Sequence, residues 1–177
     1  SYSKKYAEKT KNNYRERFSF YNGKFGDLKK IVKNEEKFDF IIFDLGVSSL
    51  QIFNLNKGFS FNSKSEIDMN MGHNSISVKD VLNNFSLSTL NDIIKFLGEE
   101  RESFRIAKNI TNERKKKPIL FTPDLVDIIK KSKKKDFNKK INISTKTFQA
   151  LRIFVNQELS ELIEGLISAT ELIKSGG

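Results

Sequence analysis

The sequence contains no cysteine and only one histidine among its 177 residues. The absence of cysteine excludes a disulfide framework and thiolate zinc sites, and it fits a reducing compartment. The single histidine, His73, leaves no histidine cluster, so we expect no metal site. No stretch reaches the roughly 18 consecutive apolar residues that a membrane span requires. We therefore expect a soluble, cytoplasmic protein that does not contact the membrane.

The net charge of +10 comes from one part of the chain. Residues 101–146 hold 15 Lys and Arg but only 5 Asp and Glu, whereas the rest holds 17 of each. A segment with this excess predicts a polyanionic partner, because phosphate neutralisation supplies most sequence-independent nucleic-acid affinity. An alternative stays open: 26 of the 32 basic residues are Lys, and a biased genome composition could supply surface lysines without selection for binding.

Alternating and then continuous apolar residues over 38–43 predict a strand buried on both faces, as in a parallel sheet. Asp44, Gly46, Ser48 and Ser49 follow it directly. Ligands of such sheets bind beyond the carboxyl ends of the strands, which makes these residues a candidate ligand site. An ordinary exit from strand to loop is the alternative, since Asp, Gly and Ser also form turns.

The order of predicted elements gives the fold class. A helix over residues 1–11 precedes a short strand at 17–21, a helix at 27–33 and the strand at 38–43. Strand, helix and strand form a βαβ unit, so we predict an α/β fold with parallel pairing. Two strands are too few for a stable sheet, so further strands must come from elsewhere.

The remainder of the chain predicts helices. We expect them at residues 78–85, at 90–96 with Ser86 or Ser88 as cap and Gly98 as end, at 99–115, from an N-cap at Thr122, and over 145–174 with a break near Gly165.

Several blocks of sequence occur in a specific order and spacing. They are Asp44-Leu-Gly-Val-Ser-Ser49, Gln51, Gly58-Phe-Ser-Phe61, Ile67-Asp-Met-Asn-Met71, Gly98-Glu-Glu-Arg101, Arg105-Ile-Ala107 and Thr145–Leu159. Together they resemble the RsmH (MraW) family of S-adenosylmethionine-dependent methyltransferases, from about Phe18 to Gly177. Several blocks in order are far more specific than one short motif.

The resemblance implies a Rossmann-like methyltransferase sheet with an inserted small all-helical domain. We expect residues 1–52 to be part of the methyltransferase domain, 53–144 the inserted, basic, RNA-binding domain, and 145–177 a helical return to the first domain. The family pattern also includes a glycine-rich cofactor loop before this chain and more strands after it. We therefore expect a fragment that keeps one side of the cofactor pocket and binds S-adenosylmethionine weakly alone.

The family's activity is methyl transfer from S-adenosylmethionine to the exocyclic N4 amine of a cytosine in small-subunit (16S) ribosomal RNA. Carbon-5 methylation would need a nucleophile, normally Cys, which the chain lacks; amine methylation does not. The resemblance places Phe25, Asp44 and Gln51 at the cofactor. Asp44, Ser48 and Ser49 are the predicted catalytic residues, which orient the amine for in-line attack.

The predicted partner is ribosomal RNA or the small ribosomal subunit. The predicted substrate-binding residues are Phe59, Phe61, Asp68, Arg101, Arg105, Lys146, Gln149, Arg152 and Asn156. For the last three, a solvated helix face explains the spacing nearly as well. The chain departs from the family at Asn70, where Arg is usual, and at residues 142–144, where His-Pro-Ala is usual. Two alternatives remain, a non-catalytic RNA-binding module and a purely structural α/β domain.

Overall fold

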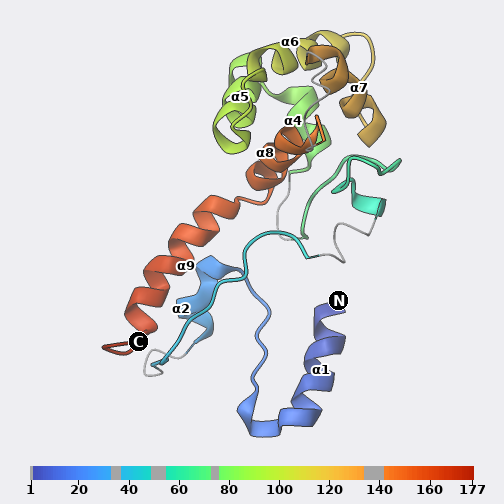
Figure 1. Cartoon of the computed structure of the whole chain (residues 1–177). Coiled ribbons are helices and arrows are strands. Elements are labelled where there is room, and N and C mark those ends of the chain that lie inside the picture. Colours follow the sequence, from blue (N-terminus) through green and yellow to red (C-terminus); the bar gives the residue numbers. More distant parts are fainter. Residues whose placement is uncertain (1, 33–36, 49–54, 73–75, 134–141) are drawn as a thin grey trace. The chain divides into compact units, whose positions relative to one another are not determined.

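A computed structural model of the chain describes residues 2–32, 37–48, 55–72, 76–133 and 142–177, and these residues are predominantly helical (Figure 1). The elements are α1 (Tyr2–Tyr14), η1 (Arg15–Arg17), η2 (Phe25–Asp27), α2 (Leu28–Ile31), η3 (Leu55–Lys57), α4 (Val78–Asn84), α5 (Leu87–Asp92), the π-helical turn η4 (Ile93–Leu97), α6 (Ser103–Glu113), α7 (Thr122–Ser132), α8 (Thr145–Val155) and α9 (Glu158–Leu172).

The described residues contain no β-strand, so the sheet of the α/β prediction is not observed and the strands predicted at 17–21 and 38–43 do not form. Residue Phe38 makes one parallel bridge, to Ile173. The physical reason is a lack of partners, because a strand is stable only when neighbours pair with it and cover its faces. Phe40 and Ile42 are 82% and 90% exposed.

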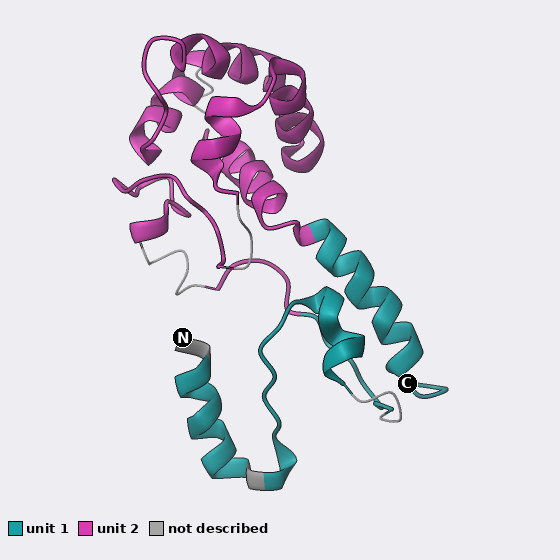
Figure 2. Cartoon of the chain, turned by 180° about the vertical axis from the view of Figure 1, so that it is seen from behind, with its two compact units in different colours: residues 1–43, 159–177 teal, residues 44–158 magenta. Residues whose placement is uncertain are grey.

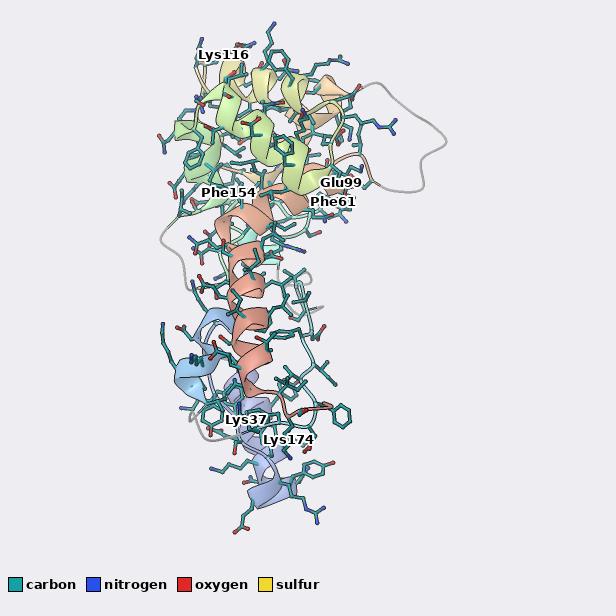
Figure 3. All side chains as sticks on the ribbon, turned by 90° about the vertical axis from the view of Figure 1, so that its left-hand side faces the viewer. Lys37, Phe61, Glu99, Lys116, Phe154 and Lys174 are labelled. Atoms are coloured by element: carbon teal, nitrogen blue, oxygen red, sulfur yellow. The ribbon has the colours of Figure 1, made fainter. Side chains whose placement is uncertain are left out.

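That single bridge ties the predicted strand to the end of α9. The Phe38 amide donates to the Leu172 carbonyl oxygen, and the Lys174 amide donates to the Phe38 carbonyl oxygen, both at 2.9 Å. Lys174 also forms an ion pair with Asp39 at 2.7 Å (Figure 3). Residues 38–43 are therefore extended and held at one end, without a ladder.

The chain divides into two compact units, which Figure 2 shows in different colours. Unit 1 comprises residues 1–43 and 159–177, and unit 2 comprises residues 44–158. These limits differ from the domain boundaries expected at 52/53 and 144/145, which stay a prediction about the domains of a methyltransferase. The first and last parts of the chain belong to the same unit, with unit 2 between them in sequence.

Unit 2 is built around an apolar core to which α4–α8 contribute. The fully buried side chains at its centre include Leu82, Leu90, Ile110, Leu125 and Leu151. Burying one such side chain contributes roughly 1.5–3 kcal/mol. The loop before α4 also reaches this core, through Ile67 and Met69.

Local side-chain chemistry sets the start of three of these helices. Ser77 and Asp80 form a capping box at α4, and Ser86 caps α5 by accepting a hydrogen bond from the Thr89 amide at 3.1 Å. The prediction of Thr122 as N-cap of α7 is wrong by one residue. Asp124 accepts the Phe121 amide at 3.2 Å, so the helix begins at Thr122 and the cap is Phe121.

The long helical stretch breaks at residues 156–157 rather than near Gly165. Gln157 adopts a left-handed backbone with φ of 53°, which ends α8 and begins α9. Gly165 lies inside α9, where an added Cβ would come within 2.9 Å of the Phe25 Cβ and 3.1 Å of a Phe43 ring atom. This glycine is needed for close packing, because the neighbouring segment approaches the helix too closely for a side chain.

In unit 1, α9 packs against the segment around η2. The Gly26 amide donates to the Glu161 carboxylate at 3.1 Å, which also pairs with Lys24 at 3.0 Å. Phe25 and Phe43 meet edge to face with ring centroids 5.5 Å apart. The rest of α9 leaves a set of apolar side chains about half exposed: Leu159, Ile163, Leu166 and Ile167.

None of the helices formed by the described residues is long and apolar enough to cross a bilayer.

Candidate functional site

The loop of residues 67–71, one of the sequence blocks noted above, is held in place by Asn156 at the end of α8. The Asn156 amide group donates to the carbonyl oxygens of Met69 at 2.8 Å and Arg152 at 2.9 Å. Its carbonyl oxygen accepts the Met71 amide at 2.9 Å. Asn156 is only 6% exposed and thus forms part of the interior, where it satisfies backbone groups of the loop.

The same loop contains a strained residue. Met69 is fully buried and has φ of 54°, a left-handed conformation that is costly for a residue with a side chain. The hydrogen bond from Asn156 to its carbonyl oxygen and the burial of its side chain offset this cost. The loop therefore has one defined conformation at the surface of the unit 2 core.

Asn70, the position where the resemblance leads us to expect Arg, forms hydrogen bonds inside the loop. Its side-chain carbonyl oxygen accepts the Gly72 amide at 2.6 Å, and its NH₂ group donates to the Ile76 carbonyl oxygen at 3.2 Å. Lys57 donates to the Asn70 carbonyl oxygen at 3.0 Å. Asn70 is 9% exposed, and its uncharged side chain stabilises the loop through these hydrogen bonds.

Asp68 is a half-buried residue of this loop. Its carbonyl oxygen accepts the Val78 amide at 2.9 Å, so the loop is hydrogen-bonded to the start of α4. The pKa of Lys79 is raised, chiefly by its hydrogen bond and ion pair with Glu66, and further by the charges of Asp80 and Asp68. The Asp68 carboxylate is therefore part of an acidic surrounding for Lys79.

Phe59 and Phe61 both pack against the unit 2 core and are partly buried. The Phe61 ring meets Phe148 of α8 edge to face, with centroids 6.3 Å apart (Figure 3). That contact sets the orientation of Phe61. The structure thus brings Phe61, the loop of 67–71 and α8 into contact with one core.

The four predicted positions on α8 and its end have different surroundings. Lys146 is exposed and donates to the Glu99 carbonyl oxygen at 2.9 Å, while Gln149 is exposed. Arg152 forms a two-point ion pair with Glu158, at 2.8 and 3.0 Å. Asn156 is the buried member described above. The four predicted substrate-binding residues therefore differ in their surroundings. Lys146 and Gln149 are exposed, Arg152 is ion-paired, and Asn156 is buried.

Arg101 and Arg105 both lie on the exposed surface near the start of α6. Arg105 forms a long, exposed ion pair with Glu102 at 3.3 Å. Such pairs contribute little, so the guanidinium stays accessible to a stronger anionic ligand.

Sequence reasoning missed a buried ion pair in the block of residues 98–101. Glu100, 5% exposed, meets Lys133 at 2.6 Å, and Lys133 also donates to the Ile143 carbonyl oxygen at 2.8 Å. The pair links the start of α6 to the end of α7 and the approach to α8. The repeated acids Glu99 and Glu100 were the available signal, but nothing in their spacing separates a buried from an exposed carboxylate.

The predicted cofactor and catalytic residues belong to different units. Phe25, in unit 1, is 40% exposed and packs on Phe43. Asp44 and Ser48, in unit 2, are exposed and flank Gly46, whose φ of 105° favours glycine. Ser49 and Gln51 lie outside the described residues.

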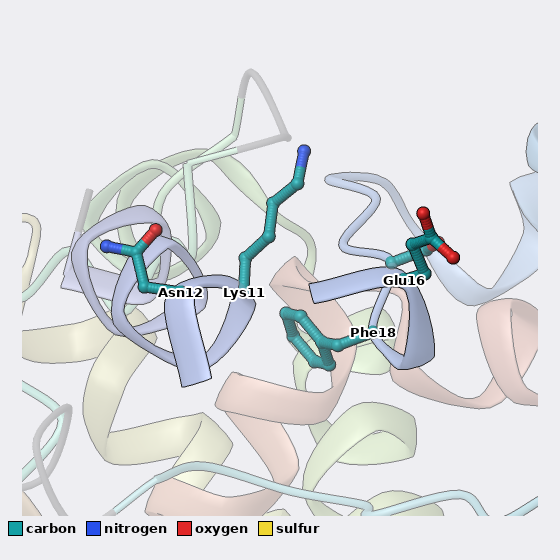
Figure 4. Close-up of a pocket in the computed structure, with 5 residues that line it drawn as sticks. Lys11, Asn12, Glu16 and Phe18 are labelled. Carbon is teal, nitrogen blue, oxygen red and sulfur yellow. The ribbon is translucent and has the colours of Figure 1, made fainter. Parts of the chain in front are cut away.

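The part of the chain that the structure describes contains no group of three or more His, Asp or Glu side chains arranged to hold a metal ion. An open hollow of about 660 Å³ is lined by Lys11, Asn12, Glu16, Phe18 and Ser19 (Figure 4). Its described lining does not include the predicted site residues, and it lies in the N-terminal part of unit 1.

Comparison with known proteins gives consistent matches. A model of the MraW methylase family matches residues 3–177. Proteins named ribosomal RNA small subunit methyltransferase H are similar to the chain. The one from Ehrlichia canis is 39% identical over 97% of this chain and 59% of its own length. Those from Bartonella bacilliformis and Orientia tsutsugamushi are 42% and 41% identical over 86% and 93% of this chain, and 46% and 54% of their own lengths.

Proposed function

The chain belongs to the MraW methylase family, and from this premise we propose that it is part of an S-adenosylmethionine-dependent ribosomal RNA methyltransferase. The proposed reaction transfers a methyl group to the exocyclic N4 amine of a cytosine in small-subunit (16S) ribosomal RNA. The proposed partner is that RNA or the small ribosomal subunit, which would place the protein in the cytoplasm. One observation carries the proposal, the identity of 39–42% to ribosomal RNA small subunit methyltransferases over 86–97% of the chain.

The chain spans about half the length of the curated relatives it matches. The activity is therefore proposed for the whole enzyme. We propose that the Rossmann-like sheet forms with segments outside these residues. Support comes from unit 1, where Phe40, Ile42 and the apolar side of α9 are exposed. Apolar faces of this kind are normally covered in an α/β sheet.

The residues that the family likeness assigns to the cofactor have suitable chemistry. Phe25 offers a partly exposed aromatic face for an adenine ring, and Asp44 offers an exposed carboxylate that accepts hydrogen bonds from an amine. When bound, S-adenosylmethionine supplies an electrophilic sulfonium methyl group. The residues of this chain would bind the cofactor and orient the target amine. Methyl transfer to an amine needs no nucleophilic cysteine.

The target amine must present its lone pair for attack. In the proposed mechanism the Asp44 carboxylate and the Ser48 and Ser49 hydroxyls accept hydrogen bonds from the amine, which weakens its conjugation with the ring and aligns the nitrogen. A cytosine in folded RNA must first leave its stack. The wall that receives it would be the segment of Phe59 and Phe61 with the loop of residues 67–71, whose conformation Asn156 maintains.

The direct test uses Asp44→Ala in the complete enzyme, with small ribosomal subunits and radiolabelled S-adenosylmethionine. We expect methyl transfer to disappear while the circular dichroism spectrum stays unchanged, because Asp44 is exposed. Asp127→Ala, an exposed carboxylate on α7, is the matched control and should keep full activity. Activity retained by Asp44→Ala would show that the assignment of this residue is wrong.

The excess of basic residues in 101–146 favours a second candidate, a non-catalytic RNA-binding module. That candidate predicts RNA binding with steep salt dependence that S-adenosylmethionine does not alter. Calorimetric titration of S-adenosylmethionine into this chain and into the complete protein separates the two. Binding by the complete protein supports the methyltransferase, whereas binding by neither favours the module.

A further inference from the structure

Helix α6 has two chemically opposite sides. Its inner side consists of Ile106, Ala107 and Ile110, which are fully buried in the unit 2 core. Its outer side is exposed and includes Phe104, Arg105 and Lys108. The inner side fixes the helix on the core, so the outer side is presented to solvent on a rigid element.

Phe104 does not fit the pattern of an amphipathic helix, in which the outer side is polar. Its side chain is 56% exposed although the apolar side of the helix faces the other way. Cationic residues lie near it: Lys108 follows four residues later, one turn along α6, Arg105 follows directly, and Arg101 lies in the turn that precedes the helix. Residues three and four apart are surface neighbours on a helix.

A single exposed Phe is common in proteins and needs no explanation by itself. The combination is informative because three exposed cations lie within four residues of the ring, one of them a single helical turn away. Glu102 is the acidic residue paired here, and its contact with Arg105 is exposed and long at 3.3 Å. We name the four residues Arg101, Phe104, Arg105 and Lys108 the α6 basic face.

We propose that the α6 basic face binds single-stranded RNA, with a base stacked on Phe104 and neighbouring phosphates held by Arg101, Arg105 and Lys108. This proposal rests on the proposed function and adds to it a defined docking surface outside the reacting site. Positive charge around an exposed aromatic ring is complementary to an unpaired nucleotide, which offers a phosphate and a free base face.

The geometry favours single strands over duplex RNA. In an A-form helix the bases are stacked on each other, so an exposed ring has no base face to meet. Cations alone would bind duplex and single strand by charge. Phe104 is therefore the residue that distinguishes the two, and the proposal predicts that its ring contributes only to the binding of unpaired RNA.

The test is a fluorescence anisotropy titration of this 177-residue chain with labelled oligouridine of about ten nucleotides. Phe104→Ala should weaken binding roughly tenfold, and Phe104→Tyr should keep it. Arg105→Gln should weaken binding and lower the slope of log affinity against log salt by about one. Circular dichroism should be unchanged for these exposed positions.

Two matched controls lie elsewhere in unit 2. Phe121→Ala removes another partly exposed ring, 43% exposed, and Lys64→Gln removes another exposed charge. Both should bind like the unaltered chain. Unchanged affinity of Phe104→Ala, an equal loss in both aromatic variants, or absence of oligouridine binding would each overturn the proposal. A loss of duplex binding equal to the loss for oligouridine would also overturn it.

Methyl transfer by the complete protein separates this proposal from the proposed function. If Asp44→Ala stays active while Phe104→Ala loses oligouridine affinity, the site assignment fails and the docking surface stands. If Asp44→Ala is inactive and Phe104→Ala binds oligouridine normally, the site assignment stands and the docking surface fails. If the site assignment and the docking surface are both correct, Phe104→Ala should raise KM for the ribosomal substrate and leave kcat near its original value.

Discussion

The side chain of Asn156 donates a 2.8 Å hydrogen bond to the carbonyl oxygen of Met69, a residue 87 positions earlier in the chain. The contact joins the end of α8 to a buried residue with a left-handed backbone. Asn156, which the sequence predicted as a substrate-binding residue, thus satisfies buried backbone groups of the loop.

Asn156→Ala should destabilise the protein by about 3 kcal/mol, because it leaves the Met69 carbonyl oxygen and the Met71 amide without their partner inside the protein. Urea unfolding measures this loss, and hydrogen exchange at the Met71 amide should accelerate. Asn156→Asp keeps the acceptor but places a buried carboxylate against the Met69 and Arg152 carbonyl oxygens, so its loss should be at least as large. Gln149→Ala, exposed on the same helix, should change stability by less than about 0.5 kcal/mol.

Glu100→Gln should cost about 3–5 kcal/mol, because it leaves the Lys133 ammonium buried without its counter-charge. Thermal or chemical unfolding gives the value. The control is the exposed ion pair of Glu102 and Arg105, where Glu102→Gln should change the unfolding free energy by less than about 1 kcal/mol. Replacement of both Glu100 and Lys133 by apolar residues should recover much of the loss. A small effect of Glu100→Gln would mean that water reaches Lys133.

The cap of α4 should make part of the stability depend on pH. Hydrogen bonds from the Ser77 side chain, and then its backbone amide, lower the pKa of Asp80. A carboxyl whose pKa is lower in the folded state stabilises fully above its unfolded pKa, near pH 4, and loses this contribution as the pH falls through the lower folded value. Asp80→Asn should thus cost about 1 kcal/mol at neutral pH and less in acid.

Urea unfolding at several pH values tests the cap. The difference in unfolding free energy between the unaltered chain and Asp80→Asn should shrink below about pH 4. Asp127→Asn, at an exposed position on α7, is the control and should show a much smaller difference. A difference for Asp80→Asn that stays constant over the acid range would contradict the assigned hydrogen bonds.

Gly165→Ala should destabilise unit 1 although Ala is the better helix former by about 1 kcal/mol. The new Cβ would lie 2.9 Å from the Phe25 Cβ, too close without movement of the η2 segment. Hydrogen exchange in residues 25–28 should therefore become faster. Ser160→Ala, at an exposed position of the same helix, should not change it. Slower exchange in Gly165→Ala would show that the segment around Phe25 can move to accept the added methyl group at little cost.

The helices of unit 2 were predictable because their signals are local. Apolar residues at helical spacing predicted α4, α6 and α7 within a few residues, and Ser86 was one of two proposed caps for α5. The N-cap of α7 was predicted one residue late, because the Asp124 carboxylate caps the backbone of Phe121.

The break between α8 and α9 and the two strands depend on distant contacts. Asn156 ends α8 while bonded to Met69, whose approach no local pattern of the helix reveals. The strand at 38–43 has the right composition, but pairing needs partners, and Phe38 alone finds one. The chain spans about half the length of the curated relatives it matches. Whether a segment such as 38–43 forms a strand therefore cannot be predicted from its composition alone.

Individual site residues were harder to predict than the segments that contain them. The block of 98–101 was recognised, but not that Glu100 is buried against Lys133. The spacing of Arg152 and Asn156 suggested a common face, whereas burial assigns one to an ion pair and the other to the interior. Burial follows from tertiary packing, so it cannot be obtained from spacing on one helix.

The exposure of Phe40 and Ile42 has a practical consequence for anyone who produces this polypeptide. An extended segment with apolar side chains on open solvent is a template for edge-to-edge association and a substrate for chaperones. Yield and solubility should therefore respond to what is co-expressed with it. Co-expression with a second polypeptide that covers these side chains is a rational route to a well-behaved sample.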